Sequence, residues 1–209
     1  MNRRQGFASR ARARLAIALG LAAAALHGCA LLGEPEPTII IGGEAWTHIP
    51  DVPFVVTDKD VVGAMLELAE VSARDVVYDL GCGDGRIVIA AAARYGAHGV
   101  GVDMDPVPLR MARAGAQRAG VTDRVQFIRG DLYEADLRGA TVVTLYLSPE
   151  VNQRLLPKLL AELPAGARIV SHKFSMGEAW APQKTVRAGD STLYLWIVPA
   201  RPAPKASER

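Results

Sequence analysis

Three alternate glycines, Gly81, Gly83 and Gly85, stand between two apolar runs of the sequence. The first run, residues 76–80, predicts a buried strand, and the second predicts a helix that begins near Gly85. Because glycine has no β-carbon, this loop lets a bound molecule approach the backbone closely. Asp79, near the carboxyl end of the strand, is well placed to meet a positively charged group on that molecule. The residues therefore predict a ligand site on the loop.

The spacing of the glycines narrows the class of ligand. In the dinucleotide-binding pattern Gly-x-Gly-x-x-Gly, the third glycine would fall where Arg86 stands. The loop is therefore fitted to a nucleoside without a pyrophosphate, and a nicotinamide-dependent oxidoreductase is disfavoured. The segment Asp79–Gly85, Asp-Leu-Gly-Cys-Gly-Asp-Gly, resembles the first motif of class I S-adenosylmethionine-dependent methyltransferases. The resemblance implies S-adenosylmethionine as the cofactor; the alternative is a glycine-rich turn in another α/β protein.

Two more acids follow later strands. Residues 98–103 predict a second strand that ends at Asp103, where an acid can receive two ribose hydroxyls. Residues 124–129 predict a third strand followed by Asp131, and class I methyltransferases commonly use an acid there to accept a hydrogen bond from the adenine amino group. The alternative for Asp131 is a turn aspartate that caps the next segment. The expected cofactor-binding residues are Asp79, Gly81, Cys82, Gly83, Gly85, Asp103, Met104, Asp131 and Leu132.

The remaining patterns predict the elements that hold the loop and the acids in place. Thr57 is a plausible N-cap for a helix over about residues 58–70, and Pro106 and Gly120 bound a helix over 106–119. Further helices are predicted over 86–94 and 151–162, and further strands over 140–147, 167–174, 184–187 and 191–198. Residues 39–41 form a short strand or pack on the body, and 42–52 form a loop. The resemblance implies an α/β fold with a Rossmann-like, seven-stranded class I methyltransferase sheet, mostly parallel with an antiparallel strand near the C-terminal end.

The loop Tyr146–Pro149, after the fourth strand of the sheet, concerns the methyl acceptor. Amide and adenine N-methyltransferases place Asn or Asp, then Pro-Pro and an aromatic residue there, and this chain lacks that combination. Its Leu-Ser-Pro sequence and the segment Leu163–Ser171 instead resemble the small lysine methyltransferases that modify the c subunit of ATP synthase. The resemblance covers residues 51–198 and implies methylation of an amine, most specifically a protein lysine. A small-molecule acceptor stays open.

A segment before the first helix carries a weaker resemblance to the same enzymes. Pro53–Thr57 resembles a Pro-Tyr-x-Pro-Thr segment found in c-subunit lysine methyltransferases and in histone-lysine methyltransferases without a SET domain. Phe54 replaces the tyrosine and Val56 the second proline. The alternative is a hydrophobic staple onto the following helix.

The expected chemistry is an in-line attack on the sulfonium methyl, in which the enzyme chiefly positions the nucleophile. No dedicated base is required, because burial beside a sulfonium depresses the pKa of a lysine amine. Tyr146, Ser148, Pro149 and Phe174 are candidates for the acceptor pocket, although both aromatics are equally explained as core residues. His172 is a candidate proton relay or a structural histidine. No spacing of His, Cys and carboxylates predicts a metal site.

The composition is that of a globular protein with one domain. The 209 residues include 24 basic and 22 acidic side chains. Five arginines fall within residues 3–14, and without them 19 basic side chains face the 22 acidic ones. The basic total therefore gives no indication of nucleic acid binding. A monomer is expected.

The first 29 residues resemble an export signal. The basic head precedes an uncharged run of 12 residues, Leu15–Leu26. As a helix this run spans only about 18 Å, which is too short for a bilayer. Leu26–Cys29 resembles a lipobox, so Cys29 is a candidate for lipidation and membrane attachment. The alternatives are a cytoplasmic protein with an uncleaved anchor or a misassigned start, and a twin-arginine signal.

The expected organisation is a leader over residues 1–29, a linker over 30–50, the methyltransferase domain over 51–200 and a disordered tail over 201–209. An exported location conflicts with the cofactor, because S-adenosylmethionine is made and kept in the cytosol. A second hypothesis is therefore a lipoprotein that binds S-adenosylmethionine or S-adenosylhomocysteine without catalysis.

Overall fold

The computed structural model describes residues 39–41, 44–46 and 55–200, and the leader and the tail lie outside this range. The chain divides into two compact units, Met1–Thr47 and His48–Arg209. The described part of the first unit is an antiparallel pair of strands, β1 (Ile39–Ile41) and β2 (Glu44–Trp46). The expected loop over 42–52 is therefore wrong at β2, which lies inside the expected linker. Pairing with β2 supplies the hydrogen-bond partners that the β-branched residues of β1 need as a strand.

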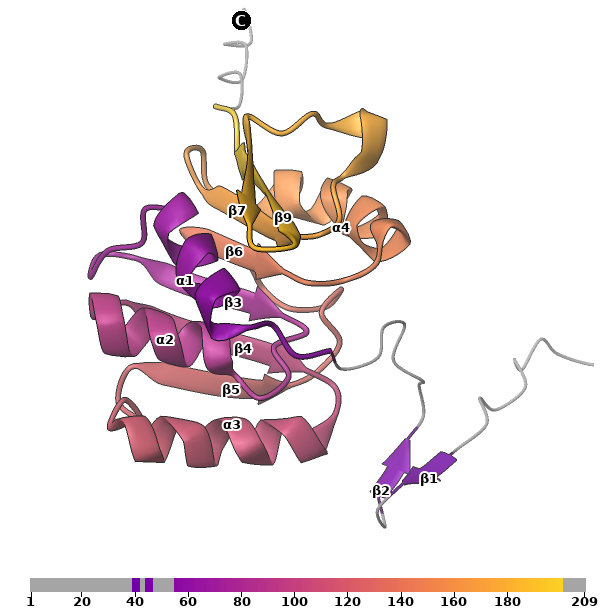
Figure 1. Ribbon diagram of the computed structural model, residues 1–209. Coiled ribbons are helices and arrows are strands. Elements are labelled where there is room, and N and C mark those ends of the chain that lie inside the picture. The colour runs from indigo at the N-terminus through magenta and orange to yellow at the C-terminus, as the bar shows by residue number, and fades with distance from the viewer. Residues whose placement is uncertain (1–38, 42–43, 47–54, 201–209) are drawn as a thin grey trace, which may run out of the picture. The chain divides into compact units, whose positions relative to one another are not determined.

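The second unit is a seven-stranded sheet in the order β5-β4-β3-β6-β7-β9-β8 (Figure 1). The first five strands of this order are parallel, and β9 is antiparallel to both of its neighbours. The predicted fold class is confirmed. The strands are β3 (Val76–Leu80), β4 (His98–Asp103), β5 (Val125–Arg129), β6 (Val142–Leu145), β7 (Arg168–His172), β8 (Lys184–Ala188) and β9 (Ser191–Ile197).

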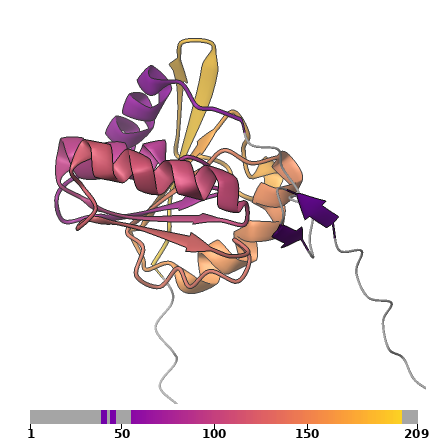
Figure 2. The same cartoon turned by 90° about the horizontal axis from the view of Figure 1, so that it is seen from below.

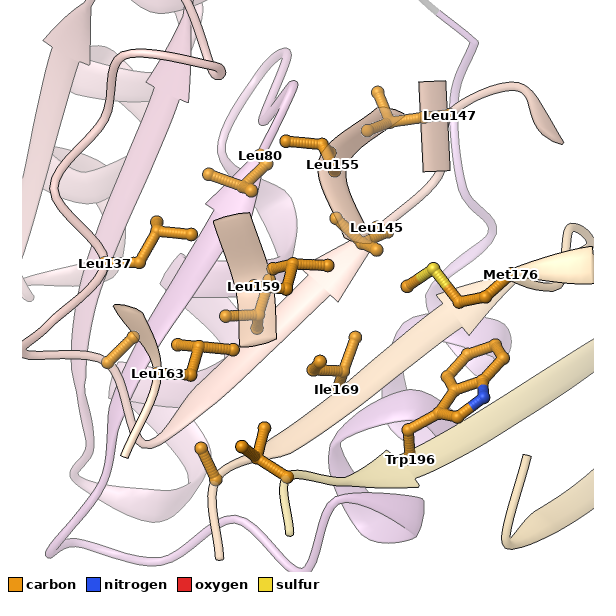
Figure 3. Packing of buried hydrophobic residues seen from close by; sticks show 14 of the residues in the cluster. Leu80, Leu137, Leu145, Leu147, Leu155, Leu159, Leu163, Ile169, Met176 and Trp196 are labelled. Carbon is orange, nitrogen blue, oxygen red and sulfur yellow. The ribbon is translucent and has the colours of Figure 1, made fainter. Parts of the chain in front are cut away.

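Helices cover both faces of the sheet (Figure 2). They are α1 (Lys59–Leu68), α2 (Arg86–Tyr95), α3 (Pro106–Ala119) and α4 (Pro149–Glu162), with a short 3₁₀ turn at Gly177–Ala179. Alternate strand residues divide the core between the two faces. Val77, Val142 and Val170 belong to the cluster that packs on α1 and α2. The opposite face carries the larger cluster under α4, in which Leu155 and Leu159 pack with Ile169 and Trp196 of the sheet (Figure 3).

The differences from the predicted boundaries that matter most concern α1, β6, β7 and α4. Helix α1 is capped by Asp58 and not by Thr57, and its cap makes no side-chain hydrogen bond. Strands β6 and β7 are shorter than expected, because the buried residues that flank them belong to loops. Helix α4 starts two residues early, because Ser148 Oγ accepts a hydrogen bond from the Val151 N–H at 3.3 Å and Pro149 fits the first turn.

Candidate active site

A cavity of about 290 Å³ lies beyond the carboxyl ends of the parallel strands. The strand order reverses between β3 and β6, and crevices at such reversals are where open α/β sheets bind ligands. Eight predicted site residues line the cavity: Asp79, Gly81, Cys82, Asp103, Met104, Asp131, Leu132 and Tyr146. Gly83, Gly85, Ser148 and Pro149 are not among the lining residues. The structure thus places most of the predicted site residues around one cavity.

Gly83 and Gly85, which do not line the cavity, determine the conformation of the loop. The N–H of Gly83 donates a hydrogen bond to Asp103 Oδ2 at 2.7 Å. Gly85 has a φ of +72°, and a β-carbon there would lie 2.4 Å from Phe127 Cε1. A side chain at Gly85 is therefore excluded by both its backbone and its neighbour. These glycines fix the course of the loop, and the backbone at Gly81 faces the cavity.

The Asp103 carboxylate is oriented by the backbone. In addition to the Gly83 bond, its Oδ1 accepts a hydrogen bond from the Asp105 N–H at 2.9 Å. Burial raises the pKa of Asp103, and the backbone hydrogen bonds oppose that rise. Each carboxylate oxygen keeps a further lone pair, so the group can also accept hydrogen bonds from ligand hydroxyls.

Asp79 lies deeper, with 3% of its surface exposed. Thr144 Oγ1 donates a hydrogen bond to its Oδ1 at 2.7 Å. Burial raises the pKa of Asp79 to about 7; the Thr144 hydrogen bond opposes the rise, and the negative charges of Asp103 and Asp84 add to it. A carboxylate crowded in this way is stabilised by a cation placed next to it. The floor of the cavity therefore favours a positively charged ligand.

Asp84 and Arg86 also line the cavity, and the sequence interpretation gave neither a role. They form a salt bridge of 2.5 Å. Burial alone would raise the pKa of Asp84, but the hydrogen bonds and charge of Arg86 outweigh it and the pKa is lowered. Arg86 Nη1 also donates to the carbonyl of Thr57 at 2.7 Å, which ties the segment before α1 to the glycine loop. The motif itself could have indicated a role for Arg86, because Arg86 stands where a dinucleotide site would have glycine.

Asp131 is a turn aspartate that also lines the cavity, and its contact with adenine stays a prediction. It lines the cavity, and its Oδ1 accepts a hydrogen bond from the Tyr133 N–H at 2.8 Å, as a turn aspartate does. Tyr133 and Val55 line the cavity as well and were missed, because nothing in their local sequence distinguishes them from packing residues.

The other end of the cavity is aromatic. Tyr146 lines it, with its ring centroid 3.9 Å from that of His172 and 6.4 Å from that of Phe174. His172 is buried, and its Nε2 lies 2.7 Å from Ser191 Oγ. Burial, with the nearby charge of Lys173, lowers the pKa of His172 to about 4, so the imidazole is neutral at pH 7. The negative charge of Asp58 acts on His172 in the opposite sense but does not outweigh burial.

Neither a thiolate nor a metal centre is built into this part of the chain. Cys82 is buried, and burial together with the charges of Asp79 and Asp103 raises the pKa of its thiol. The thiol is thus protonated at neutral pH and is no nucleophile. Within residues 55–200 there is no cluster of three or more His, Cys, Asp or Glu side chains that could hold a metal ion.

The doubly wound sheet and the acidic cavity at its switch point define a class I S-adenosylmethionine-dependent methyltransferase. The chain belongs to the ANTKMT methyltransferase domain family, whose model matches residues 79–184. It is 43% identical over 157 residues to a protein-lysine N-methyltransferase of Saccharolobus islandicus (strain REY15A), covering 73% of this chain and 97% of the relative. It is 39% identical to an adenine nucleotide translocase lysine N-methyltransferase of Mus musculus, over 70% of this chain and 63% of that protein.

A solved structure agrees with the family and fixes the cofactor. The crystal structure of an RNA methyltransferase from Salinibacter ruber in complex with S-adenosyl-L-homocysteine superimposes with a TM-score of 0.69 at 52% identity. The match covers 74% of this chain and all of that one. S-Adenosylmethionine is the cofactor of this enzyme, and the acidic, glycine-lined cavity fits its sulfonium and ribose. The similarities do not favour the alternative of a lipoprotein that binds the cofactor without catalysis.

Proposed function

We propose that this methyltransferase acts on the side-chain amine of protein lysines. The observation that carries the proposal is the neutral aromatic wall of Tyr146, backed by His172 and Phe174, at the end of an otherwise acidic cavity. The relative from Saccharolobus islandicus, a protein-lysine N-methyltransferase that this chain matches over 97% of its length, supports it.

The cofactor is held at the acidic end. Asp103 accepts hydrogen bonds from the ribose hydroxyls while Gly83 and Asp105 keep its carboxylate in place. Asp131 accepts from the adenine amino group, and Asp79 balances the positive charge at the far end of the ligand. Bound there, S-adenosylmethionine supplies an already activated methyl group.

The aromatic wall receives the acceptor amine. A lysine attacks only after it loses its proton, and the wall itself consists of aromatic residues, with Asp58 as the carboxylate whose charge reaches His172. The Lys173 ammonium, 5.6 Å from the Tyr146 ring centroid, further disfavours a second positive charge. The proton therefore passes to water, and the residues serve to position the amine in line with the methyl group. Ser148 and Pro149 contribute by starting α4 shortly after Tyr146 in the sequence.

Methylation of RNA is a second candidate. It is favoured by the 52% identical structure, which is of an RNA methyltransferase. A groove beside the cavity also carries Lys59, Arg94 and Arg118, which suit a phosphate backbone.

One experiment separates the two acceptors. The purified enzyme is incubated with labelled S-adenosylmethionine and an extract of cells that lack the protein, and the products are digested with protease or with ribonuclease. Label that is lost with protease and maps to lysine on mass spectrometry supports the proposal. Label that is lost with ribonuclease and survives protease refutes it in favour of RNA.

We propose separately that residues 1–29 direct export and that Cys29 attaches the chain to a membrane. The basic head, the short apolar run and the Leu26–Cys29 sequence support this, and these residues lie outside the described range. None of the described helices has the length and apolar character needed to cross a membrane. Fractionation of the tagged full-length chain tests the proposal: wild type should sediment with membranes and Cys29→Ala should not. A wild-type chain found in the cytosol would support a misassigned start, and a Cys29→Ala chain that still sediments with membranes would support an uncleaved anchor.

We also propose that the enzyme is a monomer, as expected from the sequence. Light scattering coupled to size-exclusion chromatography tests this directly.

A further inference from the structure

A strained turn follows β7 beside the aromatic wall. Lys173 has a φ of +66°, in the left-handed region that residues with a side chain seldom occupy. Its N–H donates to the carbonyl of Thr192 at 2.8 Å. The carbonyl of Phe174 accepts hydrogen bonds from Ser171 Oγ at 2.6 Å and from Asn152 Nδ2 at 3.1 Å. Partners from β9, β7 and α4 therefore hold this turn in one conformation.

The turn carries the Lys173 ammonium over Tyr146. Its Nζ lies 5.6 Å from the centroid of the Tyr146 ring, within the range of a cation–π contact. Lys173 is exposed, so its amine can exchange protons with water, while Tyr146 lines the cofactor cavity. A lysine of the enzyme itself thus contacts the ring that lines the cavity, while Lys173 is not among the lining residues.

The other described lysines differ in their surroundings. Lys158 forms a 2.5 Å salt bridge with Glu162 on α4. Lys184 lies exposed on β8, the edge strand of the sheet. Lys59 begins α1 and lines the basic groove. Lys173 is the lysine that contacts the aromatic wall, which separates it from these three as a candidate acceptor.

We infer that Lys173 is a site of self-methylation within one chain, an inference that rests on the proposed lysine specificity. Lys173 first releases a proton to water. The lone pair of its neutral Nζ then forms a bond to the sulfonium methyl carbon as the carbon–sulfur bond breaks. The sulfur keeps the electron pair of that bond and loses its positive charge, which leaves S-adenosylhomocysteine, and the charge passes to the nitrogen of Lys173 as a methylammonium.

The test uses the full chain with labelled S-adenosylmethionine and no other acceptor. Peptide mass spectrometry should locate the methyl group on Lys173. Because the step occurs within one chain, about tenfold dilution of the enzyme should leave the fraction modified at a given time unchanged. Lys173→Arg should lose the label, whereas the control Lys184→Arg should keep it at the wild-type level. Thermal melting of both variants checks that they are folded.

Each outcome bears on a defined claim. An unlabelled Lys173 in an enzyme that labels protein lysines in cell extract refutes self-methylation and leaves the proposed function standing. A fraction modified that rises with enzyme concentration shows transfer between copies and refutes the intramolecular step. Label confined to RNA refutes both the inference and the proposed function.

Discussion

Replacing Asp103 by alanine should weaken cofactor binding without unfolding the protein. The carboxylate accepts hydrogen bonds from the Gly83 N–H, at 2.7 Å, and from the Asp105 N–H, at 2.9 Å. Alanine leaves the buried Gly83 amide and the two ribose hydroxyls without this acceptor. A group left unpaired in this way costs about 1–3 kcal/mol. The affinity for S-adenosylhomocysteine should therefore fall roughly 5- to 150-fold.

The measurement is a calorimetric titration of wild type, Asp103→Ala and a control, Asp123→Ala. Asp123 is exposed and does not line the cavity, so the control removes one negative charge without touching the site. It should bind within about twofold of wild type. Circular dichroism confirms that each variant is folded, because loss of the Gly83 hydrogen bond also lowers the free energy of unfolding. A folded Asp103→Ala variant with wild-type affinity would remove Asp103 from the cofactor site.

Three further predictions test other parts of the molecule. The pKa of Asp79 is raised to about 7, so its carboxyl is protonated below that pH and ionised above it. Affinity for the cationic S-adenosylmethionine should therefore rise as pH increases through about 7. In titrations across this range, the affinity of Asp79→Asn should not change with pH. Tyr146→Ala should slow methyl transfer about threefold to thirtyfold, since a cation–π contact contributes roughly 0.5–2 kcal/mol. Binding of S-adenosylhomocysteine should stay close to wild type, and Tyr146→Phe should keep most activity. Equal losses of methyl transfer and of cofactor binding would contradict a role on the acceptor side. Leu159→Ala, at a fully buried position under the sheet, should lower the free energy of unfolding by about 2–5 kcal/mol in urea titrations, and a smaller loss would show that α4 repacks.

The sequence predicts the acidic end of the cavity well because its signals are local. Strands β3 and β4 were predicted at their observed limits, since each apolar run stops at a glycine or an acid. Neighbouring parallel strands then bring Asp79, Asp103 and Asp131 to one edge by geometry alone. Even β2 had a local signal, because the pair Gly42-Gly43 directly after the apolar triplet Ile39–Ile41 is typical of a hairpin turn.

The acceptor end is harder to predict, because its contacts join distant residues. Tyr146 and Phe174 were included in strands, since apolar composition does not distinguish a strand from a buried loop. The turn at Lys173 depends on Asn152, and no sequence pattern predicts a left-handed lysine. The predicted N-cap at Thr57 was wrong for the same reason, because the carbonyl of Thr57 accepts a hydrogen bond from Arg86, 29 residues away.

The reversal of strand order between β3 and β6 divides the cavity by charge. On one side, β4 ends at Asp103 and Asp131 follows β5, and these acids attract a cationic cofactor and are stabilised by it. On the other side, Tyr146 follows β6, and β7 ends at His172, which is neutral because burial outweighs the opposing charge of Asp58. A lysine that enters beside the bound sulfonium therefore meets positive charge on one side and aromatic surface on the other. The sulfonium charge lowers the pKa of the amine, and the ring stabilises the positive charge that develops on the nitrogen as the bond forms. The same topology that opens the cavity thus favours the neutral amine that the transfer requires.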